Sequence, residues 1–145
     1  WGVNTSRGTY VDIMPQDAFS GCRCEKCQAA YRKNDPHYAT ELIWGNTVTI
    51  ANRLKKEGIP GIITMMAYRP YRRVPAMDIP DNVMVMVAET GPWSKGNPAQ
   101  KKLDDEEIRA WTKKLGRKVW IWNYVNKGAT LTMPGVRAPT ANITK

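Results

Sequence analysis

The sequence predicts an α/β fold with four parallel strands, which corresponds to about half of a TIM-type β/α barrel or to an open α/β sheet. Two observations lead to this prediction. The central strand candidates are apolar throughout, as expected of parallel strands that are covered on both faces. The connections from helix to strand, Gly58–Pro60 and Gly116–Arg117, are very short, whereas the connections that leave the strands are long. This asymmetry is typical of β/α barrels and open α/β sheets.

Four segments are expected to form the strands. The first ends at Pro15, which lacks the N–H group needed to continue a ladder. The second and third are uninterrupted apolar runs, and the fourth contains Trp120 and Trp122. The predicted ranges are 10–14, 61–68, 83–88 and 118–125.

A long helix is predicted from Pro36 to about Glu57, after a short helical stretch near 24–33. Asp35 is a suitable N-cap, Pro36 suits the first helical position, and Gly58 ends the helix. The predicted buried face is formed by Tyr38, Leu42, Gly45, Val48, Ala51 or Asn52, and Leu54 or Lys55.

A third helix is predicted to begin at Asp104 and to end before Gly116. The acidic run 104–107 would fill its first turn, and Lys113 and Lys114 would fill its last turn. These charges would complement the helix dipole at both ends. The predicted buried stripe consists of Ile108, Trp111 and Leu115.

Length and composition indicate a single α/β unit over 1–145. The apolar fraction of 42% and the charged fraction of 24% are ordinary for a globular domain. No apolar run approaches the roughly 20 residues of a membrane span, so no membrane partner is expected. Because the chain starts at Trp1 rather than Met, we expect it to be an excised piece of a larger barrel protein. The net charge of +9 is scattered over loops and helix ends, which leaves nucleic-acid binding as a minor alternative.

Functional sites in these folds lie at the C-terminal ends of the strands. Two carboxylates stand there, Asp17 after the first strand and Glu89 after the third, and we predict them as the catalytic pair. Aromatic and amide side chains at the same ends are predicted to bind the substrate. They are Tyr68, Trp122, Asn123 and Tyr124.

Several of these segments together resemble a known family. They are Asp17 followed by Gly21-Cys22-x-Cys24-Glu25-x-Cys27, then Ala67-Tyr68, Asn82-Val83-x-Val85 and Val119-Trp120-x-Trp122-x-Tyr124. The set resembles an uncharacterised bacterial family of large, mostly secreted proteins, whose glycoside-hydrolase-like barrel is similar to those of hexosaminidases and α-glucuronidases. The similarity covers residues 10–134, and the Asp-to-cysteine block is its most specific part.

This resemblance implies a carbohydrate-active barrel with Asp17 at a strand end facing the sugar, and a secreted or periplasmic parent protein. It establishes neither an acid nor a nucleophile. Glu89 stands where the sequence departs from the family's usual pattern, so its predicted role depends on its position alone.

The three cysteines allow three interpretations. Cys22, Cys24 and Cys27 could bind zinc together with His37, which lies ten residues after Cys27. Two of them could form a disulfide and leave one thiol free. They could also be partly buried thiols at the end of a loop. The second and third interpretations are preferred, so neither a metal nor a cofactor is expected.

Two functions from different classes follow. The first is an enzyme that hydrolyses glycosidic bonds with paired carboxylates and aromatic sugar platforms, although the isolated piece is expected to be inactive. The second is a non-catalytic carbohydrate-binding or scaffold domain with the same aromatic residues. Carbohydrate is the expected partner in both. The strands 61–68 and 83–88 are apolar on both faces, and in a four-stranded piece one edge and part of one face would lack cover. This predicts self-association of the isolated chain, with Val83–Val87 or Val119–Ile121 near the contact.

Overall fold

The computed structural model describes residues 10–17, 19–91 and 97–123. These residues form an α/β unit with strands and helices in the order β1, α1, α2, β2, β3, α3, β4. The strands are β1 (Tyr10–Asp12), β2 (Ile62–Ala67), β3 (Val83–Ala88) and β4 (Trp120–Trp122), and the helices are α1 (Glu25–Ala30), α2 (Thr40–Lys56) and α3 (Pro98–Leu115).

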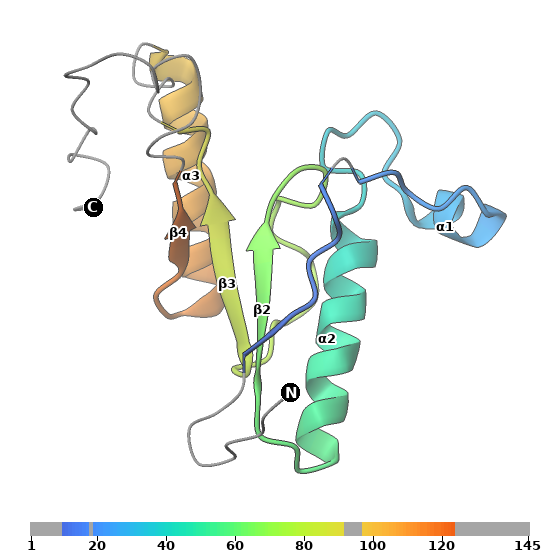
Figure 1. The fold of residues 1–145 in the computed structure, drawn as a ribbon. Helices are drawn as coiled ribbons and strands as arrows, with labels where there is room; N and C mark the ends of the chain where they lie inside the picture. The colour runs from blue at the N-terminus through green and yellow to red at the C-terminus, as the bar shows by residue number, and fades with distance from the viewer. Residues whose placement is uncertain (1–9, 18, 92–96, 124–145) are drawn as a thin grey trace, which may run out of the picture.

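The four strands form one parallel sheet in the order β1-β2-β3-β4 (Figure 1). Each strand therefore lies beside its predecessor in the chain, as in the wall of a β/α barrel, whereas the strand order of a doubly wound sheet reverses at a switch point. The predicted α/β fold class is confirmed, and the sequential order is consistent with a partial barrel.

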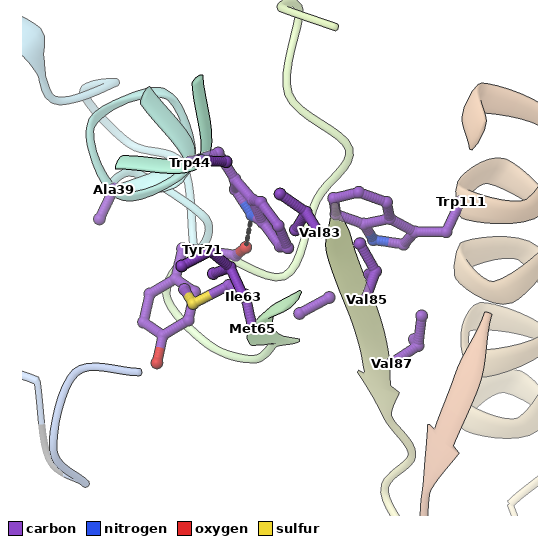
Figure 2. Close-up of a cluster of buried hydrophobic side chains, with 11 residues drawn as sticks. Ala39, Trp44, Ile63, Met65, Tyr71, Val83, Val85, Val87 and Trp111 are labelled. Atoms are coloured by element: carbon purple, nitrogen blue, oxygen red, sulfur yellow. Dashed lines mark hydrogen bonds between the residues drawn. The ribbon is translucent and has the colours of Figure 1, made fainter. Parts of the chain in front are cut away.

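Both long helices pack on one face of the sheet. The side chains of Trp44 in α2 and Trp111 in α3 are fully buried, and their rings contact each other with centroids 4.6 Å apart. Figure 2 shows them above a row of aliphatic residues from the central strands. Registered pairs in this row are Ile63 with Val83, Met65 with Val85, and Ala67 with Val87. This cluster is the hydrophobic core.

The connection from β2 to β3 crosses the same face and contains no helix. The indole groups of Trp44 and Trp111 bind its backbone through hydrogen bonds. The Trp44 indole N–H donates to the carbonyl of Tyr71 at 2.8 Å, a hydrogen bond drawn in Figure 2. The Trp111 indole N–H donates to the next carbonyl, that of Arg72, also at 2.8 Å. The backbone of an irregular connection needs such partners, because a buried carbonyl without a hydrogen bond is costly.

The predicted start and buried face of the long helix are wrong. Helix α2 begins at Thr40, although the Asp35 carboxylate does accept a hydrogen bond from the backbone N–H of His37 at 2.8 Å. Asp35 therefore caps a turn that precedes the helix. The buried residues of α2 are Thr40, Trp44, Thr47 and Ala51, and of these only Ala51 belongs to the predicted face.

Helix α3 begins six residues before the predicted start. Asn97 is its N-cap and accepts a hydrogen bond from the Gln100 N–H, while Pro98 occupies the first turn. The acidic run 104–107 therefore lies inside the helix and does not complement the dipole at its N-terminus. The predicted end is confirmed, because Gly116 caps the helix with a left-handed φ of 61°.

The opposite face of the sheet carries the intervening residues of each strand. These residues differ in how deeply they are buried. Thr64 and Met66 on β2 are buried there, and Met84 and Met86 on β3 are half-buried. Among the residues that the structure describes, neither long helix covers this face, so the predicted cover on both faces is only partly found. Self-association of the chain stays a prediction. None of the described helices has the length and apolar character to cross a membrane.

Candidate functional site at the C-terminal ends of the strands

The predicted site residues follow strands that end at one edge of the sheet, because all four strands run parallel. Glu89 comes directly after β3, and Asn123 directly after β4. The structure joins these two residues. The Asn123 side-chain amide donates to a carboxylate oxygen of Glu89 at 2.9 Å, and the Glu89 backbone N–H donates to the Trp122 carbonyl at 2.9 Å. Two of the predicted residues thus form one polar unit.

Glu89 is half-buried, and its surroundings favour the protonated form. Burial raises the pKa of its carboxyl group, and the negative charges of Asp104 and Asp105 raise it further. Lys101 and Arg72 act in the opposite direction, but more weakly. A raised carboxyl pKa is the property that a general acid requires.

We expect Glu89→Gln to be more stable than the wild type at neutral pH. The folded state binds the Glu89 proton more tightly than the unfolded chain does, so the wild type loses stability as the pH rises through the raised pKa. Below the ordinary value of 4.5 the carboxyl is protonated in both states, and the difference should disappear. Urea titrations of both proteins at several pH values measure this difference in stability.

Glu106→Gln is the control for a general charge effect, since this α3 carboxylate is exposed to solvent. A Glu89→Gln variant that is less stable than the wild type at neutral pH would contradict the assigned surroundings of Glu89.

Asp17 lies on the other half of the edge and is exposed. Two tyrosines follow β2 on this side, the half-buried Tyr68 and the buried Tyr71. Burial raises the pKa of Tyr71 to about 12, with further contributions from Tyr68, Asp17 and Asp12. These four side chains are therefore close enough to interact electrostatically. Tyr71 and Asp12 were not predicted from the sequence.

The structure thus separates the predicted residues into two groups. Asp17 and Tyr68 belong to the β1–β2 side, and Glu89, Trp122 and Asn123 belong to the β3–β4 side. In the described part of the chain, no hydrogen bond or ion pair connects Asp17 to Glu89. Tyr124, predicted to bind the substrate, lies outside the described residues.

Three exposed aromatic side chains lie on the sheet face opposite the helices, which we call the aromatic face. Tyr10 is 60% exposed, Trp120 is 62% exposed and Trp122 is 45% exposed. Asp12 of β1 shares this face, because alternate strand residues point the same way. Only Trp122 was predicted as a site residue; the period of two that relates it to Trp120 was the signal that could have added Trp120.

The three cysteines come together in the loop before α1. Their Sγ atoms all lie within 4.8 Å of one another; Cys22 and Cys24 are exposed, and Cys27 is half-buried. Hydrogen bonds from the Cys27 backbone and from the Cys22 and Cys27 thiols lower the pKa of Cys24. The side-chain hydrogen bond to Cys24, then the one to Cys22, raises the pKa of Cys27 to about 11.

His37 is not a member of this cluster, which corrects its predicted place as a fourth ligand. Its side chain is buried, and its Nδ1 has no hydrogen-bond partner. Burial lowers the pKa of His37, and the nearby positive charge of Arg73 lowers it further. A buried, neutral imidazole of this kind is a packing residue of the turn before α2.

Comparison with known proteins gives a family but no characterised relative. The chain matches the family model described as "Domain of unknown function (DUF4838)" over residues 3–144, and it therefore belongs to that family. No curated protein and no solved structure matches it.

Proposed function

With membership of this family as the premise, we propose that the chain is part of a carbohydrate-active, glycoside-hydrolase-like barrel that acts on glycosidic bonds. The observation that carries the proposal is the aromatic face, where Trp120 and Trp122 are exposed on the last strand of a sequentially ordered parallel sheet. Exposed tryptophans offer a flat apolar surface and a polar N–H group, which suits the faces and hydroxyls of a sugar ring.

The proposed chemistry uses two carboxyl groups at the strand ends. Glu89 is the candidate general acid, because its surroundings raise its pKa, as the role of proton donor to the leaving oxygen requires. Asn123 would orient the Glu89 carboxyl through their hydrogen bond. Asp17, exposed at the end of the segment after β1, is the candidate nucleophile or base. Hydrolysis requires these carboxyls about 5–5.5 Å apart for retention or about 6.5–9.5 Å apart for inversion.

A second candidate function is carbohydrate binding without catalysis. It is supported by the exposure of Trp120 and Trp122, which can bind a sugar ring without any carboxylate. The two functions share the aromatic face and differ only in whether the carboxyl groups act on the bound sugar.

Sugar binding is the first test. Oligosaccharides, both neutral and containing uronic acids, are titrated into the chain by isothermal calorimetry. We expect Trp120→Ala and Trp122→Ala each to weaken binding by about tenfold or more, since removal of an aromatic anchor commonly costs more than about 1.4 kcal/mol. Leu103→Ala is the matched control, because Leu103 is also an exposed apolar residue, at 52%, but belongs to α3.

Hydrolysis of the bound oligosaccharide is then followed in the wild type, Asp17→Asn and Glu89→Gln. Turnover that both variants abolish, with binding unchanged, supports the hydrolase. Binding without turnover supports the non-catalytic domain. If no oligosaccharide binds, or if Trp120→Ala and Trp122→Ala bind like the wild type, the carbohydrate proposal is wrong for this face.

A further inference from the structure

The cysteine loop has no part in the function proposed above, yet the structure gathers its three sulfur atoms at one point. Cys22, Cys24 and Cys27 lie in a segment of six residues, and each pair of Sγ atoms is within 4.8 Å. In tetrahedral zinc sites the Zn–S distance is about 2.3 Å, which places two sulfur ligands about 3.8 Å apart. Small shifts of exposed side chains would therefore bring all three sulfurs to ligand distance from one ion.

Local contacts hold this loop in a defined shape. The Gln28 side chain of α1 donates to the Cys22 carbonyl at 2.8 Å, and the Gln28 backbone N–H donates to the Cys24 carbonyl at 2.9 Å. Gly21 lies against the ring of Tyr31, where an added Cβ would come within 2.5 Å of the hydroxyl oxygen. The loop can approach Tyr31 this closely only because residue 21 is glycine.

We propose that Cys22, Cys24 and Cys27 form a three-thiolate zinc site whose fourth coordination position is open to water or to an exogenous ligand. Each thiol that binds releases its proton to solvent, and the ion takes three sulfur lone pairs without any redox change. Three thiolates and Zn²⁺ carry a net charge of −1. Arg23 and Lys26, both exposed, lie between the ligands in the sequence and offset this charge.

The positions of the three sulfur atoms favour a metal site over a disulfide. A disulfide would use two of the three sulfurs and leave the third without a role, whereas one ion accounts for the convergence of all three. The site also needs no histidine, because His37 lies outside the cluster. It is independent of the carbohydrate proposal, which involves none of these cysteines.

The test is zinc binding by the full 145-residue chain. The reduced chain is incubated with Zn²⁺, dialysed, and analysed for metal content; Co²⁺ replaces Zn²⁺ in a parallel sample. We expect about one equivalent of metal and the intense thiolate-to-cobalt absorption of a tetrahedral site. Cys22→Ser, Cys24→Ser and Cys27→Ser should each reduce the bound metal to background.

Glu25→Gln is the matched control, since it changes an exposed residue of the same segment and should retain the metal. His37→Gln should also retain it. Circular dichroism checks that each variant is folded. The proposal is overturned if the reduced wild type binds no metal, or if any single cysteine variant keeps the full equivalent. Loss of metal in a folded His37→Gln variant would also overturn the three-thiolate site.

Discussion

Replacing Trp111 with alanine is expected to lower the free energy of unfolding by about 3–5 kcal/mol, the usual cost of truncating a buried tryptophan. The Trp111 side chain is completely buried against Trp44. Its loss would open a cavity between α3 and the sheet and would leave the Arg72 carbonyl without its indole donor. Urea titration followed by circular dichroism measures the change.

Trp120→Ala is the control for this variant. It removes the same side chain from a position that is 62% exposed, and its effect should stay within about 0.5 kcal/mol. Trp111→Phe separates the packing of the ring from the hydrogen bond, because phenylalanine has no N–H group. A loss below about 1 kcal/mol for Trp111→Ala would mean that the α3 stripe is not buried in solution.

The second large effect is expected from Asp104→Asn. Asp104 and Arg72 form an ion pair of 2.7 Å whose side chains are 6% and 7% exposed. Asp104 also accepts hydrogen bonds from the Thr90 backbone and hydroxyl and from the Gln100 side chain. Removing one partner of a buried pair leaves the other charge uncompensated, which typically costs about 3–5 kcal/mol.

Asp105→Asn is the neighbouring control. Its carboxylate pairs with Lys101 at 2.5 Å but is 41% exposed, and pairs of this kind contribute less than about 1 kcal/mol. The double variant Arg72→Met/Asp104→Leu removes both charges and should be less destabilised than Asp104→Asn. Equal stability of Asp104→Asn and the wild type would show that the Arg72 guanidinium is solvated.

The sheet could be predicted closely because its signals are local. Strand β3 has the predicted bounds, and β2 differs by one residue at each end. Uninterrupted runs of Val, Ile and Met between turn residues leave few alternatives. The parallel order followed from the short helix-to-strand returns, which are properties of the chain alone.

The helix starts and the buried face of α2 could not be predicted in the same way. The buried stripe of α2 includes Thr40 and Thr47, whose hydroxyls donate to the carbonyls of His37 and Ile43. Hydrophobicity along the sequence cannot reveal that a hydroxyl finds its partner in the adjacent turn, so the periodicity selected Leu42 and Val48 instead. The position of the stripe was set by Trp44 and its distant hydrogen bond to Tyr71.

The candidate site, too, could be predicted from the sequence only in part. That Glu89 and Asn123 come together follows from adjacent parallel strands, which end at one edge. The raised pKa of Glu89 comes first from burial and then from the negative charges of Asp104 and Asp105 in α3, and both causes depend on how α3 packs against the sheet.

The two indole hydrogen bonds to neighbouring carbonyls have a consequence for the order of folding. They join residues 27 and 39 positions apart in the chain, so neither can form from local structure alone. The first needs α2 against the connection, and the second needs α3 there as well. Contacts of such separation carry a loop-closure cost before they stabilise anything. We therefore expect the β2–β3 connection to become fixed only after both helices have docked, and the helices and the two central strands to unfold as one cooperative unit rather than as two successive βα repeats.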